Sequence, residues 1–214
     1  VSPEMYASFT GNSTKNIYER LKETYNLAQD VQTLVETKRN LFNDAFDSKE
    51  DLYLLDGVED LIKDLYTNGM QLVLASSSAN VTIERIFDRF NLHQYFIHKV
   101  SGEDFPKSKP HPAIFLKAAE LAQTPVENCI VIEDSLNGLR AGLAAGMQVW
   151  RFTGGSHLAG IDLTTPPDAT PHASFNDFAA LRDARPALFA APPIPVTRRV
   201  PSRCCRPIPN RAKA

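Results

Sequence analysis

The first 54 residues carry apolar side chains at helical spacing and show no alternating strand pattern. A stretch that starts at Ser13 or Thr14, either of which can act as an N-cap, places apolar residues four apart over positions 17–25. A second apolar stripe covers positions 31–46, and Asp30 before it suits an N-cap. The pattern predicts two helices in a unit that has no strand of its own.

From Gly57 onward, short apolar strands alternate with amphipathic helices. Near-continuous apolar strands separated by helices are typical of a parallel sheet covered on both faces. We therefore predict an α/β fold with a Rossmann-like parallel sheet. The predicted order is helix 58–69, strand 70–78, helix 80–90, a loop over 103–112, helix 112–122, strand 129–132, helix 136–145 and strand 147–152.

Composition divides the chain into three parts: the helical unit at 1–54, the α/β core at 55–182, and a tail at 183–214. The tail holds seven of the 15 prolines and seven Lys/Arg residues against one acid. Such a composition buries too little apolar area to offset the entropy of ordering, so we predict a disordered tail. A nucleic-acid-binding arm is the functional alternative for this segment.

The net charge of −2 hides an asymmetry, because the first 182 residues carry 16 basic and 24 acidic groups. An acidic body gives no reason to expect nucleic-acid binding. Three cysteines without framework spacing favour a reducing compartment, and we expect a cytoplasmic protein. No apolar run approaches the roughly 18–20 residues of a membrane span, so no membrane association is expected.

Polar residues follow the predicted strands at the edge where an open parallel sheet binds its ligands. Ser76 and Ser77 follow the first strand and precede a helix, whose free N–H groups favour an anion. Lys109 lies in a proline-flanked loop. Glu133 and Asp134 end a buried strand, and such adjacent carboxylates are costly unless a cation such as Mg²⁺ compensates them. Hydroxyls, an ammonium group and paired carboxylates together indicate phosphate-ester chemistry.

Each of these features alone also has a purely structural explanation. Serines after a strand are most often turn residues, and a lysine before proline is most often a solvated loop charge. The acids before the helix at 136–145 suit its first turn as capping groups. The order and spacing of the features together favour the functional interpretation.

Three stretches resemble motifs two, three and four of the haloacid dehalogenase (HAD) superfamily. They are LVLASSSAN, SKPHPAIF and CIVIEDSLNGLRAGLAAGM. The helical segment before them resembles the inserted cap of the β-phosphoglucomutase-like subgroup. The resemblance covers about residues 1–180 and implies a HAD-like core with an N-terminal helical cap, of which 1–54 is a part.

The resemblance also implies roles for individual residues. Ser76 and Lys109 would act on the transferring phosphoryl group, and Glu133 and Asp134 would hold Mg²⁺. The stretch FTGNSTKN resembles the loop of the cap that selects the substrate and closes over the site. The residues implied to bind phosphate are Ser76, Ser77, Asn80 and Lys109, and those of the cap loop are Gly11, Asn12, Ser13 and Lys15.

Two departures favour a phosphatase of the subgroup over the mutase. Thr14 stands where β-phosphoglucomutase has an arginine that grips the distal phosphate, although Lys15 is a candidate substitute. Ala79 stands where that enzyme has a further lysine after motif two.

The largest departure concerns motif one, which supplies the aspartate nucleophile and a second aspartate as acid/base. Residues 1–20 contain no aspartate and no apolar strand. The stretch LLDGV at 54–58 imitates part of the motif, but Leu54 takes the place of the nucleophile. We expect the family's central first strand to be missing, so that the strands at 70–78 and 129–132 lack their common neighbour.

We therefore expect a Mg²⁺-dependent hydrolase of a small phosphorylated, sugar phosphate-like metabolite, with a monomer as the expected oligomeric state. The reaction would pass through an aspartyl-phosphate, and the chain as given would be inactive without its nucleophile. The alternatives are a β-phosphoglucomutase-type phosphotransferase and a non-catalytic phosphate-binding pseudoenzyme. A haloacid dehalogenase is disfavoured, because that chemistry does not need the metal to which the paired acids point.

Overall fold

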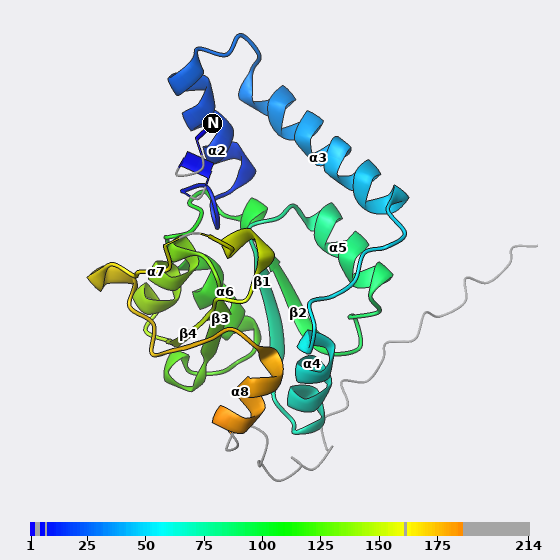
Figure 1. The fold of residues 1–214 in the computed structure, drawn as a ribbon, viewed down its shortest axis with the longest axis vertical. Helices are drawn as coiled ribbons and strands as arrows, with labels where there is room; N and C mark the ends of the chain where they lie inside the picture. Colours follow the sequence, from blue (N-terminus) through cyan, green and yellow to red (C-terminus); the bar gives the residue numbers. More distant parts are fainter. Residues whose placement is uncertain (3–4, 7, 161, 186–214) are drawn as a thin grey trace, which may run out of the picture.

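The computed structural model describes residues 1–2, 5–6, 8–160 and 162–185, and it has the predicted α/β architecture (Figure 1). Most of the predicted disordered tail, with Cys204 and Cys205, lies outside the described residues. None of the helices in the described part of the chain is long and apolar enough to cross a membrane.

The predicted helical unit consists of α2 (Thr14–Tyr25) and α3 (Val31–Ser48), which lie together beside the sheet-containing core (Figure 1). Ser13 is the N-cap of α2, because its hydroxyl accepts the Asn16 N–H at 3.3 Å. Asp30 caps α3 by accepting the Thr33 N–H at 2.9 Å. Both helices and both caps confirm the prediction.

The core contains parallel strands that alternate with helices. The structure confirms the helices and strands predicted from residue 58 to residue 152, with their ends adjusted by a few residues. The core elements are α4 (Val58–Thr67), β1 (Leu72–Ser76), α5 (Asn80–Arg89), β2 (Phe96–Ser101), α6 (Ala113–Leu121), β3 (Ile130–Glu133), α7 (Leu136–Ala144), β4 (Gln148–Phe152), β5 (Ala173–Phe175) and α8 (Phe178–Ala184).

Three elements were not predicted: β2, β5 and α8. Strand β2 reads Phe-Ile-His-Lys-Val-Ser, and its central polar pair breaks the apolar run that marks a buried strand. Strand β5 has three residues, too few for a detectable alternation. Helix α8 ends at Ala184, so the expected tail boundary at 183 falls inside its last turn.

The strands form two separate parallel sheets rather than one. Strand β1 pairs with β2, with Leu74 opposite Lys99. The second sheet has the order β3-β4-β5, with Ile132 opposite Trp150. Within the described residues no strand pairs with the edges of β1 and β3 that face each other.

An apolar groove with a volume of 700 Å³ lies between these two edges. All residues of β1 and β3 line it, and residues of α4, α5, α6 and α8 complete its walls. Two parallel strands with facing unpaired edges match what the sequence analysis expects when a common neighbour is missing. Unpaired strand edges are costly in a buried place and prone to intermolecular pairing.

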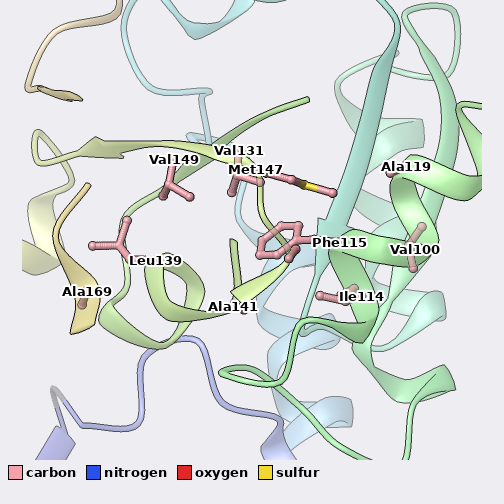
Figure 2. Packing of buried hydrophobic residues seen from close by; sticks show 11 residues of the cluster. Val100, Ile114, Phe115, Ala119, Val131, Leu139, Ala141, Met147, Val149 and Ala169 are labelled. Carbon is pink, nitrogen blue, oxygen red and sulfur yellow. The ribbon is translucent and has the colours of Figure 1, made fainter. Parts of the chain in front are cut away.

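The main hydrophobic cluster connects the two sheets and forms one side of this groove, because Phe115, Val131 and Met147 belong to both. It includes Phe115 of α6 and Leu139 of α7, the latter with no exposed surface. In Figure 2 the side chains of Phe115 and Met147 lie between Val149 and Leu139 on one side and Val100 on the other. Side chains of α6 and α7 therefore pack against strands of both sheets and hold the sheets together.

Helix α3 of the cap is anchored on helix α5 of the core. The buried Asn43 side chain accepts the Thr82 hydroxyl at 3.1 Å. The Arg89 guanidinium donates to the Phe46 carbonyl at 2.6 Å and to the Glu50 carbonyl at 3.2 Å, which closes the end of α3. Charged hydrogen bonds of this kind are stronger than neutral ones, so this end of the cap is held firmly.

The open groove predicts low stability for the chain. Mesophilic domains usually melt between about 45 and 65 °C. Because β1 and β3 each leave one edge without a strand, we expect this chain to show no cooperative melting transition above about 50 °C. Circular dichroism at 222 nm during heating measures this. A sharp melt above that temperature, with no binding of a hydrophobic dye beforehand, would contradict the expectation.

Candidate active site

The loop after β1 presents the hydroxyls of Ser76 and Ser77. Ser76 ends the strand, and its hydroxyl accepts the Ser78 N–H at 3.1 Å, which turns the chain toward α5. Ser101 at the end of β2 donates to the Ser78 carbonyl at 2.7 Å and fixes this turn from the neighbouring strand. The Ser77 hydroxyl donates to the Gly11 carbonyl of the cap loop at 2.8 Å.

Lys109 is the buried cation of the site, with a side chain only 5% exposed. Its ammonium donates to the Ala75 carbonyl of β1 at 3.2 Å and forms an ion pair with Glu133 Oε1 at the end of β3. It also lies 4.7 Å from the centre of the Phe115 ring. These contacts place one positive charge between the ends of the two sheets.

Glu133 is fixed on both of its oxygens. While Oε1 faces Lys109, Oε2 accepts the N–H of Asp134 at 3.0 Å and the N–H and hydroxyl of Ser135 at 3.2 and 3.0 Å. The Ser135 hydroxyl in turn accepts the Gly138 N–H at 3.0 Å and caps α7. A Cβ at Gly138 would overlap the Glu133 carboxylate, so the carboxylate needs a glycine in the first turn of this helix.

The pKa values of the two adjacent carboxylates are shifted in opposite directions. Burial acts to raise the pKa of Glu133, but the charge and hydrogen bond of Lys109 and the Ser135 donors outweigh it and hold this pKa below its usual value. Burial, and then the negative charge of Glu133, raise the pKa of Asp134, although His157 partly opposes them. Asp134 therefore carries negative charge that the protein compensates only in part.

A cleft of 1330 Å³ brings most of the predicted site residues together. Its floor includes the ends of β1 and β3, and its walls include the cap loop and one face of α3. Among the residues singled out from the sequence, those that line it are Gly11, Asn12, Ser13, Lys15, Ser76, Ser77, Lys109, Glu133 and Asp134. Asn80 does not line it, because its side chain donates to Asp104 at 3.0 Å and its N–H to Glu103 at 3.1 Å.

Three further residues reach this cleft region without having been predicted. His157, in the short 3-10 helix Ser156–Leu158 after β4, contacts Asp134 Oδ2 through Nε2 at 3.1 Å. Arg39 of α3 faces Glu103 at 3.6 Å, and Asn137 of α7 donates to the Thr10 carbonyl at 2.9 Å. His157 follows a strand end, so the rule that located Ser76 and Asp134 applies to it as well.

The donor set fits a hard divalent cation only in part. Oxygen ligands from carboxylates suit Mg²⁺, and the raised pKa of Asp134 marks charge that a cation would relieve. Glu133 already uses both oxygens, so Asp134 is the freer carboxylate. No group of three or more His, Cys, Asp or Glu side chains within the described residues could hold a metal ion, so phosphate and water would have to complete the shell.

Comparison with known proteins agrees with this geometry. Residues 1–152 match the family described as haloacid dehalogenase-like hydrolase. A protein of uncharacterised function from Haemophilus influenzae is 30% identical over 144 residues, which are 67% of this chain and 70% of that protein. Hexitol phosphatase B of Escherichia coli is 38% identical over 96 residues. That match covers 44% of this chain and 43% of the enzyme, so it spans less than half of either protein.

Solved structures show the same fold. A β-phosphoglucomutase from Clostridium difficile superimposes with a TM-score of 0.72 at 21% identity, covering 88% of this chain and 82% of that protein. A hydrolase from Pseudomonas syringae reaches a TM-score of 0.73 at 18% identity, covering 87% and 84%. Identity at this level establishes the fold alone, whereas the family match extends over more than two thirds of the chain. The chain therefore belongs to the haloacid dehalogenase-like hydrolase family.

Proposed function

We propose that this chain carries the phosphate- and metal-binding part of a Mg²⁺-dependent phosphoric monoester hydrolase. The observation that supports this most directly is the convergence of Ser76, buried Lys109 and the Glu133–Asp134 pair in one cleft. The names of two relatives, hexitol phosphatase B and 6-phosphogluconate phosphatase of Escherichia coli, support a small sugar phosphate-like substrate.

The phosphate group would lie at the end of β1. The Ser76 hydroxyl would donate to its oxygens, and the Lys109 ammonium would offset its charge. Asp134 would be the direct carboxylate ligand of Mg²⁺, while Glu133 would hold Lys109 and the start of α7 in place. When bound, Mg²⁺ would neutralise the phosphate oxygens and the paired acids.

The nucleophile would have to come from outside the described part of the cleft. Among the described residues that line it, Asp134 is the only aspartate, and its charge is needed for the metal. The apolar groove opens into this cleft, because Leu74–Ser76, Ile132 and Glu133 line both. A parallel strand in the groove would end beside Lys109, so an aspartate at its end would meet the phosphate.

The cap loop favours hydrolysis over phosphate transfer between two positions of one sugar. Thr14 lines the cleft where a mutase would need a cation for the second phosphate. Lys15 also lines the cleft, but its ammonium lies 3.8 Å from Glu19 and its side chain is mostly exposed. Product analysis with β-glucose 1-phosphate would separate the two reactions once a strand with a nucleophile is supplied.

Binding of inorganic phosphate in the presence of Mg²⁺ tests the site directly. We expect calorimetry to detect binding, and the double substitution Lys109→Met with Glu133→Gln to weaken it at least about tenfold, since one charged hydrogen bond is worth about 1.5–3 kcal/mol. The double variant avoids a buried uncompensated carboxylate. Lys117→Met removes an exposed lysine of α6 that pairs with Glu120, and it should bind as the wild type does. Equal binding by all three proteins would refute the site.

Replacing Asp134 with Asn should raise stability at pH 7 in the absence of Mg²⁺. The folded pKa of Asp134 is raised, so its ionised form opposes folding, and this penalty appears as pH rises through that pKa. Urea unfolding should give a higher midpoint for Asp134→Asn at pH 7, and no difference below the unfolded pKa of about 3.9. Added Mg²⁺ should stabilise the wild type only. A lower midpoint for the variant at pH 7 without Mg²⁺ would show that Asp134 is already compensated.

Turnover tests the proposal that the chain as given lacks its nucleophile. Incubated with Mg²⁺ and an aryl phosphate, it should release no phosphate above a blank. A synthetic apolar strand that ends in aspartate should confer hydrolysis, and the same peptide ending in asparagine should not. Hydrolysis by the chain alone that is lost on Glu133→Ala with Asp134→Ala would show that the chain supplies its own nucleophile.

A further inference from the structure

Three hydrogen bonds join the cap to the core across the mouth of the cleft. Ser77 donates its hydroxyl to the Gly11 carbonyl at 2.8 Å, and Asn137 donates its amide to the Thr10 carbonyl at 2.9 Å. The third bond runs the other way, from the Asn16 amide of α2 to the Ser108 hydroxyl at 2.7 Å. Their partners are 66, 127 and 92 residues apart in the chain, so the bonds report tertiary docking rather than local turns.

The core members of these bonds are sequence neighbours of the site residues. Ser77 follows Ser76, and Ser108 precedes Lys109. Asn137 stands in the first turn of α7, the helix that Ser135 caps next to Asp134. The loop after β1, the loop before α6 and the start of α7 therefore each supply one bond to the cap beside a residue of the site.

The cap loop fits this surface only because residue 11 has no side chain. Gly11 has a φ of +83°, and a Cβ there would overlap the Ser135 hydroxyl and lie 3.2 Å from Asn137 Cβ. The loop thus contacts the serine that holds Glu133. Since the accepting groups of the loop are backbone carbonyls, the bonds to Ser77 and Asn137 depend on where the loop lies and not on its side chains.

We propose that Ser77 and Asn137, which bind the cap loop (residues 9–13), and Ser108, which binds Asn16 of α2, form a latch that holds the loop closed over the cleft. These are positioning residues, and the inference depends on the proposed function only for what the closed loop covers. While the loop is closed, the Ser77 hydroxyl donates its hydrogen bond to the Gly11 carbonyl. It therefore does not donate to phosphate, which differs from the role expected from the sequence. Ser76 remains the hydroxyl of this turn that faces the substrate.

The two ends of the cap are held with different strength. Arg89 fixes the end of α3 to α5 through charged hydrogen bonds, whereas the latch consists of neutral ones. A neutral hydrogen bond changes an equilibrium by a factor of about 2 to 10. We therefore expect the latched end to open more readily than the anchored end, with the cap turning about the contact of α3 with α5. A ligand that orders the loops carrying Ser76 and Lys109 also orders Ser77 and Ser108, and so favours closure.

Hydrogen exchange of the full chain, followed by mass spectrometry, tests the latch without requiring turnover. In Ser77→Ala and in Asn137→Ala, amides of residues 9–13 should exchange about 2- to 10-fold faster than in the wild type, the range expected for one neutral hydrogen bond. Ser77→Thr keeps the hydroxyl and should retain the protection. Asn68→Ala removes a comparable side-chain bond to the Asp64 carbonyl at the end of α4, and the cap loop should not respond to it.

The exchange pattern distinguishes a latch from a general loss of stability. Unchanged exchange of residues 9–13 in both alanine variants would overturn the proposal, and so would a rise of equal size in α6 and α7, which would indicate that the whole core is destabilised. Added phosphate with Mg²⁺ should slow the loop in the wild type and less so in Asn137→Ala. If the loop ignores phosphate but responds to the alanine variants, the latch stands and the proposed phosphate site fails.

Discussion

The ammonium of Lys109 joins two strands that are not paired with each other in the described structure. It donates to the Ala75 carbonyl of β1 and pairs with Glu133 at the end of β3, so one charge bridges the two sheets at their functional edge. Burying an ion pair costs desolvation free energy that only good geometry and further hydrogen bonds offset. Ser135 supplies those further bonds to Glu133, and the raised pKa of Asp134 shows that the compensation does not extend one residue further.

From this ion pair the order of the site spreads outward through contacts that each depend on the previous one. Glu133 positions Ser135, Ser135 caps α7, and the start of α7 receives the cap loop at Gly11. The carboxylate that pairs with Lys109 therefore also positions the serine against which the cap loop packs. The charge balance, the start of α7 and the position of the cap loop are therefore one connected arrangement.

Sequence reasoning located the features whose cause is local. Helix caps such as Ser13 and Asp30 depend on a few neighbouring residues, and strand-end polar residues such as Ser76 and Asp134 follow from a general rule for parallel sheets. It missed β2, because the polar pair at His98 and Lys99 interrupts both the apolar run and the alternation that mark a strand. It also missed Asn137, since its partner lies 127 residues away and no periodicity encodes such a contact, whereas the strand-end rule could have found His157.

The use of main-chain carbonyls at Thr10 and Gly11 has an evolutionary consequence. Every residue type offers the same carbonyl, so closure imposes little selection on the side chains of the loop apart from the glycine. Asn12, which lines the cleft from the same loop, and Lys15 at the start of α2 can then be exchanged while the bonds at Thr10 and Gly11 are kept. A cap loop held in this way can acquire a new substrate preference by point substitution, while the hydrogen bonds that hold it closed are kept.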